Sequence, residues 1–511
     1  MLEVTLIKAD IDSLKQNSYI VTSLQTSWLS VAGGGVLDMA GQALEAVASS
    51  RALQASSFTS DLSRPSLDAF TLSLNTGALI LQFSETIKAS TVAPLEIVLQ
   101  SKRTVAGDSS AASVALSGGT VQQTDNLLIY VQLTSSDQNA LKAVPTLATS
   151  ARDTFLTLTT LAAEDMSGNP IFAIADGATV QATEVYADTT QPTLADFSMD
   201  LNRGRLTLTF DETVHATSFV AGAVVLQSAG SSSQPGEGLQ LQLAVAAALS
   251  AARSTEVVLD LVTAYLNEIK RTGGLCVSRE TCFLSTAAAV VHDMSGNSAV
   301  LVPSTSALQA RAYTTNTAPP VLQTFDLGDM DAGVLVMVFS ETVRKRSVLA
   351  SDLTLQSAAI LVPGEAFTLT GDSAVLGQDG TSIRVHIGTG DLNELKFRTG
   401  MTTSLATTYL SFTRAMVRDM LGNQATAVPS SAAMQAVRFV PDATRPTLQR
   451  FYLDLNLGQL RFVFSEVMST STVTFGALTL QDAAVAPTAA FRLTGGGCCR
   501  AHPRSSSTQS I

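Results

Sequence analysis

Charged side chains are scarce in this 511-residue sequence. They make up 14% of it, against a usual share of about 25%. The balance is acidic, with 43 Asp and Glu against 31 Lys and Arg, a formal net charge of −12 and no run of Lys and Arg. Because phosphate binding needs a clustered basic face, this pattern excludes a nucleic-acid partner. A polar but weakly charged surface favours a secreted or cell-surface protein over a cytosolic enzyme.

Residues that commonly perform catalysis are also rare. The sequence contains four His, four Cys and a single Trp, and aromatic residues make up 5%. His215, His292 and His386 fall at three different places of the repeat described below, so no Ser-His-Asp arrangement or His-x-x-x-His metal pair can be assembled. With Trp28 as the single Trp, the case for a site that stacks sugar rings on aromatic side chains is weak. We therefore expect no enzyme activity and assign no catalytic residue.

Long hydrophobic runs are missing as well. No apolar run approaches the roughly 20 residues that a transmembrane helix needs, and the most apolar stretch, residues 243–249, is far too short. Residues 1–8 alternate as a strand and do not resemble a signal peptide. We expect no transmembrane segment in this piece, and a signal or anchor outside it.

What the sequence does contain is a long internal repeat. An opening Pro stands at 65, 192, 320 and 446, with steps of 127, 128 and 126 residues. Three more markers follow the same register: a Lys at 15, 142, 270 and 396, an Asp-Met-x-Gly turn from 38, 165, 293 and 419, and a Glu at 85, 212, 341 and 466. One register shared by four markers indicates a tandem array.

The register divides the chain into three complete units and two half units. The segments are 1–60 (back half), 61–187, 188–315 and 316–441 (complete), 442–495 (front half) and 496–511, a tail that breaks the pattern. We expect the tail to be disordered and the sequence to be a piece of a longer protein. Each half leaves strand edges unpaired, so both halves should be less ordered than the middle.

Each unit is expected to be almost entirely strand. Phe197, Met199 and Leu201 alternate with polar residues, and the alternation resumes after an Asn-Arg-Gly turn. This pattern predicts an antiparallel hairpin with one buried face. About seven short strands in each unit of roughly 127 residues predict an antiparallel β-sandwich. Residues 391–396 are interpreted as a short turn or as one helical turn.

The units resemble the bacterial Ig-like repeats of large cell-surface, S-layer and adhesin-like proteins. The resemblance is carried by an Asp-Thr-x-x-Pro linker at 188–192, a Phe-Ser-Glu strand end at 83–85 and an Asp-x-x-Gly-Asn turn at 165–169. It covers nearly all of residues 1–495, with two departures: Asn316 replaces the linker Asp, and Asp211 replaces the Ser. The resemblance implies an all-β tandem array of Ig-like antiparallel β-sandwich domains.

In an Ig-like sandwich the linker, the end of the second strand and the last hairpin loop lie at one end. Acidic residues should therefore meet at the junctions, in the sets Asp61, Glu85 and Asp165; Asp188, Glu212 and Asp293; and Asn316, Glu341 and Asp419. Such oxygen ligands suit Ca²⁺, which would stiffen each joint. In the alternative, each Asp closes its own Asx turn while the following Gly and Asn adopt positive φ, and the Glu is a solvated strand end. The spacing matches no EF-hand loop, and both interpretations stay open.

Two cysteines stand in a Gly-rich loop of one unit only. Cys276 and Cys282 have five residues between them, a spacing that a loop can bring to disulfide distance. A local disulfide would fit an oxidising compartment. A zinc site is less favoured, because no second Cys/His pair is in sight.

The recurring lysines, Lys15, Lys142, Lys270 and Lys396, admit two interpretations. They could form a binding row along the array. We favour the other interpretation, in which each stem covers apolar surface and each ammonium group meets backbone carbonyls.

These observations favour a structural function. We expect a stalk, wall or adhesion region of an extracellular or cell-surface protein, with surface or matrix proteins or glycans as partners. The alternative is a set of spacer or carbohydrate-binding repeats of a larger carbohydrate-active enzyme. An intracellular scaffold ranks third.

Overall fold

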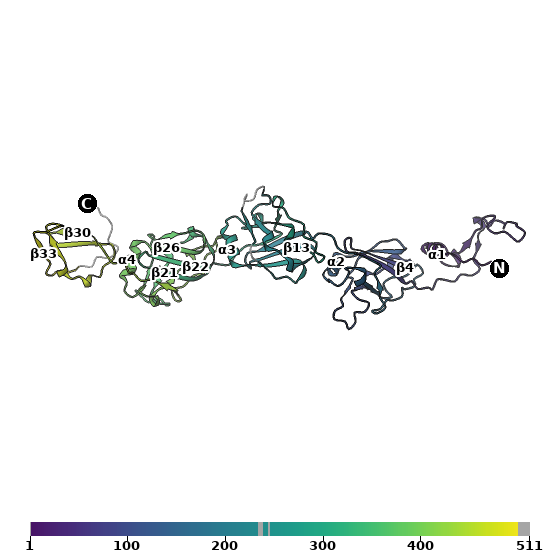
Figure 1. The fold of residues 1–511 in the computed structure, drawn as a ribbon, viewed down its shortest axis with the longest axis horizontal. Helices are drawn as coiled ribbons and strands as arrows, with labels where there is room; N and C mark the ends of the chain where they lie inside the picture. The colour runs from purple at the N-terminus through teal and green to yellow at the C-terminus, as the bar shows by residue number, and fades with distance from the viewer. Residues whose placement is uncertain (1, 233–238, 244–245, 499–511) are drawn as a thin grey trace.

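The units of the chain lie in a row along one long axis (Figure 1). The computed structural model describes residues 2–232, 239–243 and 246–498. Residues 1–60 form one end of the row and residues 442–495 the other. From residue 499 onward the tail expected to be disordered lies outside the described residues.

The first complete unit contains a five-stranded sheet, in the order β11-β3-β4-β8-β7, and a four-stranded sheet, β10-β9-β5-β6. Its elements are β3 (Leu67–Ser73), β4 (Ala78–Ile87), β5 (Ile97–Gln100), β6 (Ser113–Ala115), β7 (Thr120–Val121), β8 (Asn126–Gln132), α2 (Ser135–Lys142), β9 (Phe155–Leu158), β10 (Val180–Gln181) and β11 (Glu184–Tyr186). In the opening hairpin Phe70 pairs with Leu81 and Leu72 with Leu79. All four side chains are buried, so the alternation places them on the inner face.

The second unit repeats this topology, with sheets β16-β17-β13-β12-β20 and β15-β14-β18-β19. Its elements are β12 (Leu194–Asp200), β13 (Arg205–His215), β14 (Val224–Gln227), β15 (Gln240–Gln242), β16 (Ala246–Ala248), β17 (Arg253–Leu261), α3 (Thr263–Arg271), β18 (Phe283–Thr286), β19 (Leu308–Gln309) and β20 (Ala312–Thr314).

The third unit has the same topology, with sheets β25-β26-β22-β21-β29 and β24-β23-β27-β28. Its elements are β21 (Leu322–Asp329), β22 (Val334–Val343), β23 (Thr354–Gln356), β24 (Ala366–Thr368), β25 (Ala374–Leu376), β26 (Gly380–His386), α4 (Thr389–Phe397), β27 (Tyr409–Ser411), β28 (Met434–Gln435) and β29 (Arg438–Phe439).

The two sheets of each complete unit enclose a hydrophobic cluster of their own. The clusters run from Leu67 to Ala182, from Leu194 to Ala310 and from Leu322 to Ala436. The prediction of tandem, all-β, Ig-like sandwiches is therefore confirmed. One detail differs from a purely antiparallel sandwich, because the last strand of each unit pairs in parallel with the first.

The two half units contain much less paired structure. Their elements are α1 (Lys8–Gln16), β1 (Trp28–Leu29) and β2 (Leu53–Gln54) at one end, and β30 (Leu448–Asp454), β31 (Gln459–Phe464), β32 (Thr479–Gln481) and β33 (Ala490–Arg492) at the other. Each of their sheets has two strands. The prediction of a strand at the start of the chain is wrong, since residues 2–7 form no strand. A strand forms only where a neighbouring strand edge is available for pairing.

The segment 391–396 is helical, as one of the two interpretations allowed, but the helix is longer than one turn. It belongs to α4, a helix of nine residues, and α2 and α3 occupy the same place in the other complete units. A helix of about two turns is too short to show clear hydrophobic periodicity, so its pattern resembles that of a turn. Tertiary contacts stabilise it: Ile269 on α3 and Leu395 on α4 are buried in the cores of their units.

Candidate functional site

The recurring acidic residues and lysines meet where one unit joins the next. Each short helix lies at the end of its unit, next to the following one (Figure 1). The recurring Lys stands in the last turn of this helix. The acidic residues belong to the following unit, so each junction is built from two units.

The junction between units 61–187 and 188–315 shows the arrangement most completely. Lys142 Nζ lies 2.9 Å from Asp188 Oδ2 and also pairs with Glu212 Oε2. Carboxylate oxygens of Asp188, Glu212 and Asp293 lie within 4.8 Å of one another. The side chains of Lys142, Asp188 and Glu212 are only 8%, 1% and 9% exposed. The ammonium group of one unit thus supplies a counter-charge to a buried acidic cluster of the next.

The other junctions repeat the ion pairing across the same boundary. Lys15 Nζ lies 2.7 Å from Asp61 Oδ2 and pairs with Glu85. Lys270 lies 2.6 Å from Glu341 Oε2. Lys396 lies 3.0 Å from Asp442 Oδ2 and 2.9 Å from Glu466 Oε2. The prediction that these ammonium groups meet backbone carbonyls is wrong, because each helix directs its last turn at carboxylates that need a counter-charge.

Asn316 changes the chemistry of the third junction. Its side-chain amide donates to Glu341 Oε2 at 2.8 Å and to Asp419 Oδ2 at 3.1 Å. A neutral hydrogen-bond donor therefore stands where Asp188 places a carboxylate in the unit before.

The Asp-Met-x-Gly sequences form the expected Asx turns. Asp165 Oδ1 accepts hydrogen bonds from the backbone N–H groups of Ser167 and Asn169, both at 2.8 Å. Gly168 has φ +84°, whereas the expectation of a positive φ at Asn169 is wrong. Asn169 instead donates its amide to Asp165 Oδ2 at 2.7 Å and to the carbonyl of Asp61 at 3.1 Å, which ties the turn to the linker.

A second contact across the junction was missed by the sequence reasoning. The backbone N–H of Thr213 donates to Asn139 Oδ1 at 2.9 Å, and its hydroxyl donates to the carbonyl of Asn139 at 3.1 Å. Thr342 and Asn267 repeat both bonds at the next junction. The signal was available, since this Asn stands three residues before the Lys and this Thr directly follows the Glu.

The electrostatic environment shifts the pKa values of the junction groups. Burial raises the pKa of Glu212 to about 7, although the pairing with Lys142 opposes the shift. Burial also opposes the charged form of Lys142, but hydrogen bonds to Glu212 and Asp188 outweigh it and raise the lysine pKa. The pKa of Asp188 is lowered: burial alone would raise it, but hydrogen bonds from Thr190 and Lys142 prevail.

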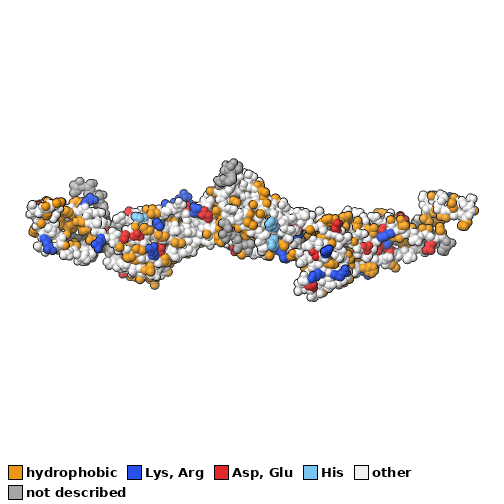
Figure 2. All heavy atoms as spheres, in the orientation of Figure 1, with side chains coloured by type: hydrophobic (Ala, Val, Ile, Leu, Met, Phe, Trp, Pro, Cys, Tyr) orange, Lys and Arg blue, Asp and Glu red, His pale blue; other side chains and the backbone are white. Residues whose placement is uncertain are grey.

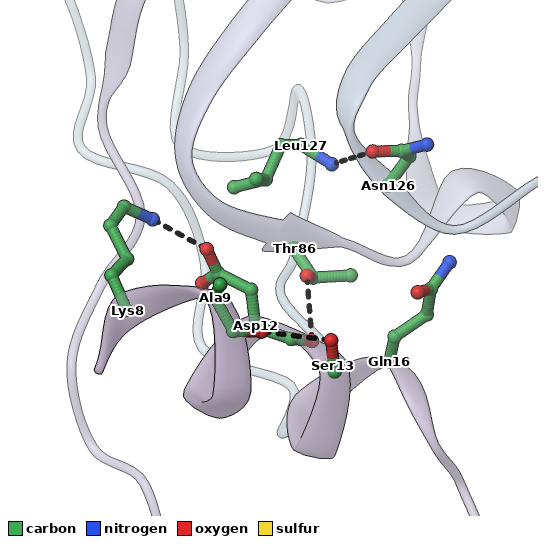
Figure 3. Close-up of a pocket in the computed structure, with 8 residues that line it drawn as sticks. All are labelled: Lys8, Ala9, Asp12, Ser13, Gln16, Thr86, Asn126 and Leu127. Carbon is green, nitrogen blue, oxygen red and sulfur yellow. Dashed lines mark hydrogen bonds and ion pairs between the residues drawn. The ribbon is translucent and has the colours of Figure 1, made fainter. Parts of the chain in front are cut away.

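An open groove lies beside the cluster at two of the junctions. At the first junction a groove of about 500 Å³ is lined by Lys8, Asp12 and Gln16 of α1 and by Thr86 and Asn126 of the next unit (Figure 3). A groove of the same volume lies between α3 and the strands β22 and β26. Polar and apolar side chains together line each groove.

The sulfur atoms of Cys276 and Cys282 form a disulfide. Cys276 has a positive φ of 47°, and Thr402, at the equivalent place of the next unit, has 52°. In both loops the N–H at this position donates to a carbonyl five residues later, at 2.9 and 2.8 Å. The bridge therefore closes a loop whose backbone the next unit forms without cysteines.

The topology defines the class of the protein, a tandem β-sandwich repeat protein. No protein-family model and no curated protein matches the chain. It is similar to the N-terminal part of the bacterial S-layer protein SbsC, at 13% identity over 39% of this chain and 44% of that chain, with a TM-score of 0.17. It is also similar to a tandem fragment of titin (8% identity, 75% and 98% of the two chains, TM-score 0.15) and to the FN1–FN3 domains of chicken CNTN1 (9%, 74% and 98%, TM-score 0.20).

The chain thus spans less than half of the S-layer fragment that it matches. Similarities at this level carry no argument about function. Among the described residues, no helix is long and apolar enough to cross a membrane.

Proposed function

We propose that the chain is a non-enzymatic structural and adhesive repeat region of an extracellular or cell-surface protein, whose units supply length and stiffness. One observation carries the proposal: at all four junctions among the described residues, a lysine of one unit pairs with carboxylates of the next. A flexible string of domains would not need buried ionic contacts between neighbours.

The junction resists bending because its charges are buried. When a unit tilts away, Lys142 leaves Asp188 and Glu212 without a counter-charge in a site that excludes most water. Removing one partner of such a pair while the other stays buried costs about 3–5 kcal/mol. The bonds between Asn139 and Thr213 also oppose rotation, because they hold a second point of the same boundary.

Calcium at these junctions stays a prediction, and the lysines bear on it. Carboxylate oxygens suit Ca²⁺, but the ammonium group of Lys142 already lies 2.9 Å from Asp188. A Ca²⁺ ion would have to displace it, so the acidic sets do not fit the ion while the lysine stays in place. We propose that the lysine ammonium groups, and not Ca²⁺, balance the charge of the junction carboxylates.

This choice between cations can be tested with Lys142→Ala. Removing the ammonium group leaves three close carboxylates, so Ca²⁺ should raise the melting temperature of the variant and leave that of the wild-type chain unchanged. Calorimetry with millimolar CaCl₂ or with chelator measures both. Lys102→Ala is the matched control, because Lys102 pairs with Asp108 on the surface of a single unit. A wild-type chain that melts lower in chelator would show that calcium holds the junctions.

Stiffness itself is measured by small-angle X-ray scattering of the full chain. We expect the scattering of one extended rod whose maximal dimension does not change with chelator. A variant with Ala at Lys15, Lys142, Lys270 and Lys396 should show a shorter mean dimension, because its junctions bend. Equal scattering from the variant and the wild-type chain would contradict the proposal.

The proposed location and partners depend on surface chemistry. The disulfide fits an oxidising compartment. Atoms of uncharged groups dominate the visible face, and the blue and red side chains are scattered (Figure 2). Such a surface suits contact with surface or matrix proteins or with glycans. Labelling of intact cells with a membrane-impermeant reagent tests the location, and absence of label on the expressed protein would contradict it.

A further inference from the structure

Two histidines of the second complete unit meet on its surface. Val214 of β13 pairs antiparallel with Asp293, so the next pair along is His215 and His292. The backbone N–H of His215 donates to the carbonyl of His292 at 2.8 Å. Side chains of directly opposite residues lie on the same face, and Figure 2 shows histidine side chains together near the middle of the row. The sequence did not indicate this pair, because the two residues are far apart in the chain and only the fold brings them together.

The other complete units place different residues at these two positions. In the first unit the N–H of Lys88 donates to the carbonyl of Glu164 at 3.0 Å, and in the third that of Arg344 donates to Arg418 at 2.9 Å. The backbone contact is therefore shared, while the side chains change from an opposite-charge pair to two histidines and then to two arginines. Of the three pairs, the histidines alone offer two ring nitrogens as metal ligands, because Lys and Arg carry only donors.

Two imidazoles in this position can hold one metal ion. Directly opposite residues have Cβ atoms about 4.5–5.5 Å apart, and from there both rings can reach an ion at the usual Zn–N distance of about 2.0–2.1 Å. Nδ1 of His292 lies 3.2 Å from the hydroxyl of Ser298. A hydrogen bond at one ring nitrogen fixes the tautomer and leaves the other nitrogen for a metal. Both histidines are half-buried, so an ion from solvent can reach them.

We propose that His215 and His292 bind one divalent transition-metal ion of the zinc or copper type, with water or the hydroxyl of Ser298 completing its coordination. Imidazole nitrogen suits Zn²⁺, Cu²⁺ and Ni²⁺, whereas Ca²⁺ prefers oxygen ligands. The site therefore differs in its chemistry from the carboxylate clusters of the junctions.

The site lies beside the boundary with the preceding unit. On its other side His215 pairs with Arg253 of β17, whose guanidinium donates to the carbonyl of Ala143 in unit 61–187 at 3.2 Å. The positive charge of Arg253 opposes a metal ion, but this bond directs it toward the preceding unit. An ion bound by both histidines would tie β13 to the segment that carries Asp293, and would so hold in place one carboxylate of the junction cluster.

Hydrogen exchange of the full chain with and without ZnCl₂ tests the proposal. The chain carries His502→Ala and alkylated thiols, so that Cys498, Cys499 and His502 near the C-terminus supply no competing ligands. We expect exchange of the His215 N–H to slow by about 100-fold at a free Zn²⁺ concentration of 100 times its Kd, because the ion binds the closed state alone. Exchange of the Arg344 N–H, which makes the equivalent bond in the third unit, should not change.

His215→Asn and His292→Asn each remove one ligand and keep a polar side chain on the surface. Loss of a hydrogen-bond partner of a metal ligand costs about 10–100-fold in affinity. Loss of the ligand itself should weaken Zn²⁺ binding at least as much, measured by titration calorimetry. His386→Asn, on β26 of the third unit, is the matched control and should bind like the parent chain. An exchange rate at His215 that does not respond to Zn²⁺, equal slowing at Arg344, or an unchanged affinity in both Asn variants would overturn the proposal.

Discussion

The junctions at Asp188 and at Asn316 differ by one charge. The first gathers the carboxylates of Asp188, Glu212 and Asp293, and Lys142 pairs with the first two of them. In the second, Lys270 pairs with Glu341. There the amide of Asn316 donates to the carboxylates of Glu341 and Asp419. The comparison teaches that the boundary needs donors directed at its carboxylates more than it needs a fixed number of acids.

The largest difference is expected when the lysines are removed. Lys142→Ala should destabilise its junction by about 3–5 kcal/mol, since it leaves buried carboxylates unpaired. Lys270→Ala should cost less, because Asn316 still donates to Glu341. Hydrogen exchange of the backbone N–H groups of Thr213 and Thr342 reports the opening of each junction. An equal loss of exchange protection at Thr213 and at Thr342 would contradict the role given to Asn316.

The pH dependence should also differ between the two. The folded pKa of Glu212, about 7, lies above its ordinary value of 4.5. Its contribution is therefore fully present below about pH 4.5 and is lost as pH rises through about 7. The charge of Asp188 disfavours ionisation of Glu212, whereas the Asn316 amide favours ionisation of Glu341. Hydrogen exchange between pH 5 and 8 should show a steeper loss of protection at Thr213 than at Thr342.

Glu212→Gln provides the control for this pH dependence. The neutral amide should remove the loss of protection at Thr213 above pH 7 and leave Thr342 unchanged. A slope that persists in this variant would assign the titration to another group.

A smaller effect is expected at the second contact. Thr213→Val and Thr342→Val each remove one hydroxyl that donates to a helix carbonyl. Each should cost about 0.5–1.5 kcal/mol, the usual net contribution of such a bond. Because both bonds have nearly the same geometry, the two losses should agree, and exchange at the two junctions measures them. A loss confined to one junction would show that the contact is not a shared part of the boundary.

The smallest effect is expected when the residue types at positions 188 and 316 are exchanged. Asn316→Asp adds a carboxylate beside Lys270 and removes two donated hydrogen bonds, while Asp188→Asn does the reverse at Lys142. Compensation should keep each change in melting temperature to a few degrees. A fall of more than about 4 °C, roughly the shift that 1 kcal/mol produces in a domain of about 100–150 residues, would show that the residue type is essential.

Much of the fold could be predicted from one sequence. The alternation at Phe197, Met199 and Leu201 indicated the opening hairpin, and the regular spacing of the prolines indicated the tandem units. The carboxylates and Asx turns of the junction followed from the same register. The pairing of Lys142 did not, since it depends on how one unit is oriented on the next. The full length of the short helices was missed because contacts with the core stabilise them.

A double-mutant cycle between Lys142 and Glu212 tests the central claim most directly. Lys142→Ala, Glu212→Gln and the double variant are compared by hydrogen exchange of Thr213 in the full chain. We predict a coupling energy of more than about 1 kcal/mol, because contacting partners of one buried pair are not additive. Additive effects of the two substitutions would contradict the claim that this pair couples the two units.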